Sequence, residues 1–202
     1  MRRIGALIFP GFELLDVFGP MEMFGLLTGD FDLQLVSERT GPIASNQSLS
    51  AYPDSTIDTV TNYDILFVPG GAGTRREVTN EPLLQWISET AENAEYIISV
   101  CTGSALLAKA GVLDGYRATT NKAAFKWVSE QGPKVEWVKQ ARWVEDRNRI
   151  TSSGVSAGMD MTLGAISLMH GTETAENVAR WCEYTWHREK GHDPFAKIHG
   201  LV

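Results

Sequence analysis

The chain has 202 residues, of which 43% are hydrophobic and 21% charged, with a formal net charge of -7 at pH 7. A chain of this size can bury a sizeable core, so we expect a single domain over residues 1–202. The acidic balance and scattered basic residues argue against nucleic acid as a partner, and no apolar run approaches the roughly 20 residues of a membrane-spanning helix.

The first quarter of the chain alternates strand and helix patterns. An apolar run over residues 3–9 predicts a strand, and apolar residues at helical spacing over 14–27 predict the helix that follows. Partial alternation over 31–36 predicts a second strand. The polar, turn-rich stretch 43–52 predicts a short hairpin or an edge strand.

A continuous apolar run over 65–68 stops abruptly at residues 69–73, which are Pro, Gly, Gly, Ala and Gly. Such a run is typical of a central strand that is covered on both faces. Helical spacing begins again at Asn80, and residues 96–100 predict the next strand. The following helix is predicted over residues 104–110.

The second half of the chain continues the alternation and adds a hairpin. Helices are predicted over residues 123–130, 156–169 and 172–184. The last two open on Ser or Thr, which we expect to cap them. Strands are predicted over residues 135–138, 142–144 and 149–152, and a turn joins the last two as a hairpin. The tail from residue 185 onward predicts no regular element.

Strands that alternate with helices predict an α/β fold, with a mostly parallel sheet and helices on both faces. In such sheets, ligands bind outside the carboxyl ends of the strands. Three turns fall at that edge, at residues 10–16, 69–73 and 101–103. We expect them to converge on one crevice.

Cys101 is the candidate nucleophile. It stands where a strand ends and a helix begins, so the positive end of the helix dipole would favour its thiolate. The order Cys101, Thr102, Gly103 resembles part of a nucleophile elbow, although Ser99 replaces the first glycine. The alternative is a small buried hydrophobe at a strand end. Cys101 and Cys182 are too few for a disulfide framework, which indicates a reducing compartment, the cytoplasm.

Two acids and two glycines are candidates to act beside this thiol. Asp16 or Glu13 could exchange a proton with it, because a carboxyl group in an apolar crevice binds its proton more tightly. The residues alone do not choose between the two acids, and the alternative role for Asp16 is in a helix cap or first turn. The amides of Gly70 and Gly71 could stabilise a developing anion, although a glycine turn by itself is more often structural.

These motifs together resemble the DJ-1/PfpI superfamily and, within it, the isocyanide hydratases. The matching motifs are residues 9–11, 15–20, 68–71, 100–103 and 153–160, in the same order. The resemblance implies a flavodoxin-like three-layer sandwich of the class I glutamine amidotransferase type, a homodimer, and no metal or organic cofactor. It also implies a reactive Cys101 on a strained turn, with Asp16 exchanging protons with the thiol and substrate and Thr102 supporting the site.

The activity that the resemblance implies is the conversion of small-molecule isocyanides to N-substituted formamides. Cys101 would add to the terminal carbon and Asp16 would protonate the adduct, with the amides of Gly70, Gly71 and Thr102 near the reacting atoms. Thr102 replaces the histidine of the superfamily's peptidases, which disfavours proteolysis, and Asn121 replaces a histidine found in many relatives. The alternatives are a glyoxalase-like enzyme acting on α-oxoaldehydes and a non-catalytic oxidative stress sensor.

Other reactive side chains are expected to be structural. His170 precedes Gly171 and is expected to end a helix, and Cys182 lies in a helical pattern that predicts packing. The histidines of the tail are too loosely spaced to predict a metal site. The tail itself is expected near the dimer interface or the mouth of the crevice.

Overall fold

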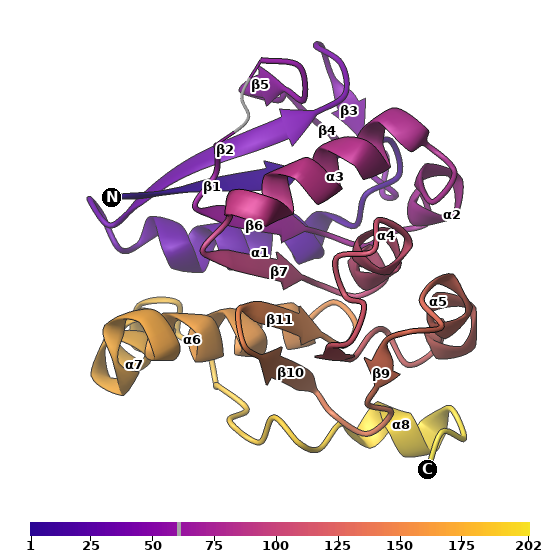
Figure 1. The fold of residues 1–202 in the computed structure, drawn as a ribbon. Helices are drawn as coiled ribbons and strands as arrows, with labels where there is room; N and C mark the ends of the chain where they lie inside the picture. Colours follow the sequence, from indigo (N-terminus) through magenta and orange to yellow (C-terminus); the bar gives the residue numbers. More distant parts are fainter. Residues whose placement is uncertain (60–61) are drawn as a thin grey trace.

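A seven-stranded sheet forms the centre of the computed structural model, which describes residues 1–59 and 62–202. The spatial order of its strands is β10-β11-β7-β6-β1-β2-β5 (Figure 1). The bounds are β1 (Arg2–Leu7), β2 (Phe31–Ser37), β5 (Ser55–Thr56), β6 (Ile65–Val68), β7 (Tyr96–Ser99), β10 (Trp143–Asp146) and β11 (Arg149–Ser152). Only the β10–β11 pair of this sheet is antiparallel, which confirms a mostly parallel sheet with a late hairpin.

Helices cover both faces of this sheet and complete three layers. Helix α1 packs against α6 behind the sheet, and α3 packs against α4 in front of it (Figure 1). The bounds are α1 (Leu14–Gly25), α2 (Thr74–Glu77), α3 (Glu81–Asn93), α4 (Gly103–Lys109), α5 (Phe125–Gln131), α6 (Ala157–His170), α7 (Thr172–Trp181) and α8 (Pro194–Ile198). Among the helices described, none combines the length and apolar character needed to cross a membrane.

Two small sheets flank the central one. Strands β3 (Ile43–Ala44) and β4 (Ser50–Ala51) pair antiparallel, which confirms the short hairpin expected there. Strands β8 (Arg117–Ala118) and β9 (Glu136–Trp137) pair in parallel.

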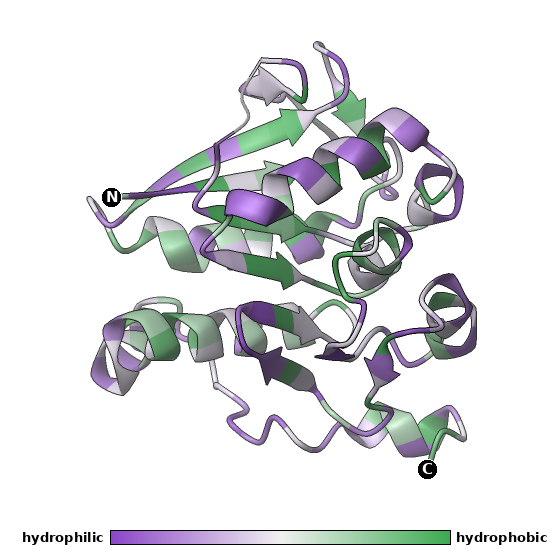
Figure 2. Cartoon of the chain, viewed as in Figure 1, coloured by the Kyte–Doolittle hydropathy of each residue, from purple (hydrophilic) through white to green (hydrophobic). Residues whose placement is uncertain are grey.

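The core lies between the sheet and its helices. All four residues of β6 are buried, which confirms that the continuous apolar run over 65–68 is a central strand. Hydrophobic residues concentrate along the central strands, whereas α3 shows alternating hydrophilic and hydrophobic bands (Figure 2). This pattern follows from burial of a parallel strand on both faces, compared with one buried face on a surface helix.

Two expectations about helix ends are wrong. The side chain of Ser156 does not cap α6, because the amides of Ala157 and Gly158 bond to the carbonyls of Gly154 and Val155 instead, at 3.1 and 3.0 Å. Helix α7 is preceded by Gly171, so Thr172 is its first helical residue and not its cap. Helix α6 therefore begins from a tight turn whose own backbone carbonyls satisfy its first amides.

The tail contains a short helix that the residue pattern did not predict. Asp193 caps α8, its Oδ1 accepting the Phe195 amide at 3.0 Å, and Pro194 occupies the first helical position. An Asp followed by Pro is a start signal for a helix, but five residues are too few to show helical spacing.

A buried ion pair fastens the start of this tail to the domain. The Asp160 carboxylate accepts the Arg142 Nε donor at 2.7 Å, and both side chains are almost fully buried. The same carboxylate accepts the Tyr184 hydroxyl at 3.1 Å and the His187 amide at 2.9 Å. Since a buried charge is tolerated only with such partners, Asp160 fixes the path of the chain after α7.

Candidate active site

Five loops meet at the carboxyl edge of the sheet around a cavity of about 300 Å³. They contribute Glu13 after β1, Gly71 after β6, Cys101 after β7, Asn121 after β8 and Val155 after β11. The three turns expected to converge therefore do so. A larger cavity of about 640 Å³ lies apart, beside β2, α2 and the start of α3, and none of its lining residues can act as a thiol nucleophile.

Cys101 lies on a strained turn between β7 and α4. Its φ of 57° is in the left-handed region, which is uncommon for a residue with a side chain. Its amide donates to the Ser153 carbonyl at 3.1 Å, and the residue is 6% exposed. Gly103 makes the turn possible, because a Cβ at that position would lie 2.2 Å from the Val68 carbonyl oxygen.

Asp16, rather than Glu13, is the acid that lies beside the thiol. Asp16 is fully buried in the first turn of α1, and its Oδ2 accepts the Gly70 amide at 2.9 Å. Cys101 lies close enough to lower the pKa of this carboxyl, whose Oδ1 is buried without a hydrogen-bond partner among the described residues. Glu13 accepts hydrogen bonds from the side chains of Gln47 and Asn46 instead. Asp16 is thus the acid that influences the thiol, whereas Glu13 lines the cavity.

Burial shifts the titration of both members of this pair. Desolvation raises the pKa of Asp16 from 3.8 to about 7. The Gly70 amide opposes this shift, the charge of Glu13 adds to it, and Cys101 opposes it more weakly. Desolvation and the charge of Asp16 raise the pKa of Cys101 from 9.0 to about 12. The Thr102 amide, the Asn121 side chain and the Val155 amide lower it in turn.

The expectation of a thiol already ionised by the helix dipole is therefore wrong for the resting site. Helix α4 has only seven residues, and the field at its start does not outweigh the burial of sulfur next to a carboxyl group. The Cys101 thiol keeps its proton near neutral pH, while Asp16 titrates there. Near neutral pH the two groups therefore differ in their protonation.

The glycine amides expected to face reacting atoms have protein partners in this structure. The Gly70 amide donates to Asp16, and the Gly71 amide donates to Thr102 Oγ1 at 3.1 Å. Thr74, which the residue pattern did not single out, adds a hydroxyl that donates to the same Oγ1 at 3.1 Å. Gly70 and Gly71 thus position the side chains of Asp16 and Thr102.

Asn121 and Val155 line the same cavity as Cys101 and supply polar groups that lower the pKa of its thiol. Val155 has a φ of 44°, which is strained for a β-branched residue, and its amide lies close enough to Cys101 to lower the pKa of the thiol. Gly154 leaves room for Asn121, since a Cβ there would lie 2.4 Å from Asn121 Nδ2. The motif over residues 153–160 marked this loop, but only coordinates reveal that its backbone turns toward the thiol.

The remaining expectations concern residues outside the pair. His170 ends α6 as expected, and Cys182 is half-buried at the end of α7 against the core.

In the tail, Phe195 and His199 line a cavity of about 240 Å³ that also includes Asn121 and Val155, so α8 does lie beside the crevice. Within residues 1–59 and 62–202, no three His, Cys, Asp or Glu side chains are grouped as metal ligands.

Comparison with known proteins gives consistent matches over most of the chain. The model of the DJ-1/PfpI family matches residues 2–168. An isonitrile hydratase of Pseudomonas putida is 36% identical over 182 residues, which are 90% of this chain and 78% of that protein. The HTH-type transcriptional regulator CdhR of Pseudomonas aeruginosa is 31% identical over 86% of this chain, which spans only 52% of the regulator. A crystal structure of a ThiJ/PfpI family protein from Pseudomonas syringae shares 34% identity with a TM-score of 0.84, covering 91% of this chain and 75% of that one.

Proposed function

The chain belongs to the DJ-1/PfpI family, and from this premise we propose that it is a cysteine-dependent hydratase converting isocyanides to N-substituted formamides. The observation that carries the proposal is the buried Asp16 carboxyl, which the Gly70 amide holds close enough to Cys101 for each group to shift the pKa of the other. The isonitrile hydratase among its relatives supports the choice of substrate class. Addition of water to an isocyanide also needs only the two groups that this pair provides, a nucleophile and a proton carrier.

In the first step, the Cys101 sulfur bonds to the terminal carbon of the isocyanide. The thiol proton passes to the Asp16 carboxylate as this bond forms, and Asp16 then delivers it to the same carbon. The product is a thioimidate in which sulfur, one hydrogen and the nitrogen are attached to that carbon. Donors from Thr102, Asn121 and Val155 stabilise the negative charge that develops on sulfur during the transfer.

In the second step, water attacks the thioimidate carbon. One water proton passes through Asp16 to the nitrogen, and the other returns to sulfur when the carbon–sulfur bond breaks. The formamide leaves and the thiol is regenerated, so atoms and electrons balance without an external oxidant or reductant. A carboxyl group with a pKa of about 7 suits this role because it can accept and donate a proton at neutral pH.

The experiment that tests the proposal measures formamide production from methyl isocyanide by mass spectrometry. We expect turnover by the native chain and none by Cys101→Ala or Asp16→Asn, whereas the matched control Cys182→Ala keeps full activity because Cys182 lies outside the cavity. Formamide production by Cys101→Ala at the native rate would refute the proposal. Lactate from methylglyoxal would favour the glyoxalase alternative, and a two-oxygen adduct at Cys101 without turnover would favour the sensor.

We also propose a cytoplasmic homodimer. Two apolar side chains of α1, Leu15 and Phe18, are 39% and 42% exposed next to the catalytic Asp16. Exposed apolar side chains on one helix are typical of an interaction surface. Light scattering should give twice the mass of the chain, and Phe18→Asp should shift it toward the monomer; a monomeric native chain would contradict the proposal.

A further inference from the structure

Arg75 is a cationic residue that lines the reaction cavity and takes no part in the proposed hydration of isocyanides. It lies on α2 and lines the same cavity as Cys101 and Thr102. Its backbone position is fixed relative to the nucleophile, because the neighbouring Thr74 bonds to Gly71 O at 2.8 Å and to Thr102 Oγ1 at 3.1 Å. The guanidinium is therefore presented from a support that is tied to the catalytic turn.

An aromatic platform holds the guanidinium in place. The Arg75 Cζ lies 4.6 Å from the centre of the Trp127 ring of α5, within the range of a cation–π contact. This stack orders the long side chain but uses none of its hydrogen-bond donors. A stacked arginine with its donors available is suited to planar acceptors.

The neighbouring Arg76 makes a useful contrast. Its Nε donates to Glu77 at 2.8 Å and its Nη2 donates to the Pro10 carbonyl at 2.9 Å, so protein atoms use its donors. For Arg75, the part of the chain that the structure describes offers no side-chain hydrogen bond and no carboxylate within 4.0 Å. The other charged residue lining this cavity, Glu13, already accepts hydrogen bonds from Gln47 and Asn46.

We propose that Arg75 recognises a carboxylate carried by the substrate, so that the preferred isocyanides are those of small acids. The inference rests on the proposed function, whose substrate class it narrows. The two oxygens of a carboxylate can accept two parallel hydrogen bonds from the N–H groups of a guanidinium. These N–H groups would otherwise bond to water. The cavity of about 300 Å³ has room for a reacting group together with an acidic substituent.

The test compares isocyanoacetate with its methyl ester, two isocyanides that differ mainly in charge. A charge-assisted hydrogen bond strengthens binding by a factor of about 10 to 100. In the native chain, kcat/KM for the acid should therefore exceed kcat/KM for the ester by at least about tenfold. Arg75→Gln should bring the ratio of acid to ester to about one, and Arg75→Lys should give an intermediate ratio because it keeps a charge without the fork. Trp127→Leu should also lower the ratio of acid to ester, because it removes the ring on which the Arg75 guanidinium stacks. The matched control Arg39→Gln removes an exposed charge outside the cavity and should leave the native ratio.

A binding measurement separates this inference from the hydratase proposal. N-formylglycine and its methyl ester are titrated by calorimetry into Cys101→Ala, where no turnover occurs; the acid should bind about tenfold more tightly, and the added Arg75→Gln change should remove the difference. Hydration of both isocyanides at equal kcat/KM would overturn the inference and leave the hydratase proposal standing. If neither isocyanide reacts, the hydratase proposal fails, and equal binding of acid and ester would then overturn the role of Arg75 as well.

Discussion

The buried Asp16 carboxyl should make the protein less stable as pH rises, and Asp16→Asn should remove this effect. The pKa of Asp16 is raised from 3.8 to about 7 in the folded chain. Between these two values the folded state keeps a proton that the unfolded state has lost, so the free energy of unfolding falls as pH increases. Each pKa unit corresponds to about 1.4 kcal/mol, so the cost at pH 8 approaches about 4 kcal/mol.

An asparagine at this position preserves the shape of the side chain, and its Oδ1 can still accept the Gly70 amide. Because the amide does not ionise, the gain in stability from Asp16→Asn should be larger at pH 8 than at pH 4 by about 4 kcal/mol. Urea denaturation of both chains at the two pH values measures this difference. The same variant should lose activity, since catalysis by a general acid or base contributes about 100- to 10,000-fold.

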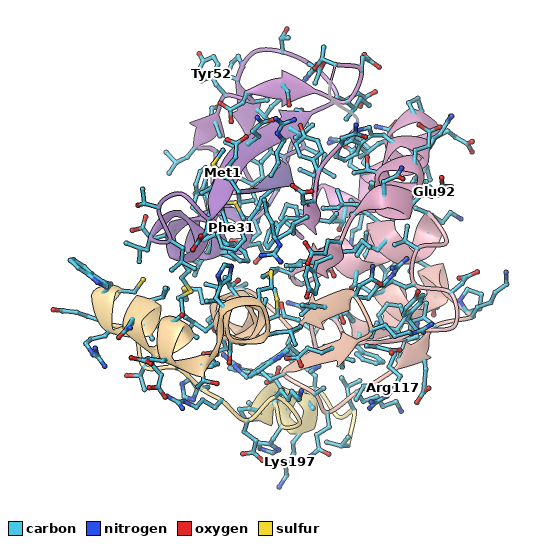
Figure 3. The ribbon with its side chains drawn as sticks, turned by 60° about the vertical axis from the view of Figure 1, so that its left-hand side comes forward. Met1, Phe31, Tyr52, Glu92, Arg117 and Lys197 are labelled. Carbon is cyan, nitrogen blue, oxygen red and sulfur yellow. The ribbon has the colours of Figure 1, made fainter. Side chains whose placement is uncertain are left out.

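The control is Glu92→Gln, which removes an exposed carboxylate on the surface of α3 (Figure 3). Its effect should stay within about 0.5 kcal/mol at both pH values, as is usual for surface substitutions. An equal effect of Asp16→Asn at pH 4 and pH 8 would show that the Asp16 carboxyl is not held in its protonated form by burial. The reasoning about the proton-sharing pair would then be wrong.

Three further predictions follow from the geometry. The kcat/KM for a neutral isocyanide should rise with pH through about 7, since Asp16 must be ionised to accept the thiol proton, and a flat profile from pH 5.5 to 8.5 would contradict this role. Asp160→Ala should destabilise the chain by about 3 to 5 kcal/mol in denaturant titrations, because it leaves the Arg142 charge buried without its partner; a change below about 1 kcal/mol would disprove the anchoring role. Gly103→Ala should lower the melting temperature and abolish turnover, because its Cβ would lie 2.2 Å from Val68 O, and native behaviour would show that the turn can relax.

The apolar pattern was enough to predict most of the fold. The run over residues 65–68 predicted a central strand, and β6 lies in the middle of the sheet with all of its residues buried. Helical spacing predicted α1 from residue 14 and α3 from Asn80, one residue before its first helical residue, because a surface helix must bury one stripe of side chains. Helix α8 escaped prediction because it is one turn long and depends on a cap and on contacts with the rest of the chain.

The candidate site was predictable in its location but not in its ionisation. The strand-to-helix position of Cys101 and the rule that ligands bind at the carboxyl edge of a parallel sheet were sufficient to bring together the turns that carry Cys101, Gly70 and the two candidate acids. The choice of Asp16 over Glu13 depended on Gln47 and Asn46, which come from the β3–β4 hairpin and lie more than 30 residues away along the chain.

The sequence by itself determined the layered architecture and the edge of the sheet at which the candidate thiol lies, because these depend on periodicity and on residue types at strand ends. Only the tertiary structure decided that the Cys101 thiol keeps its proton and which groups accept hydrogen bonds from the Gly70 and Gly71 amides. It also decided that Arg75 and Val155 line the cavity. Desolvation and hydrogen bonding are sums over neighbours from distant segments. A local pattern can name a chemical group, but the surroundings that tune it exist only after the chain has folded.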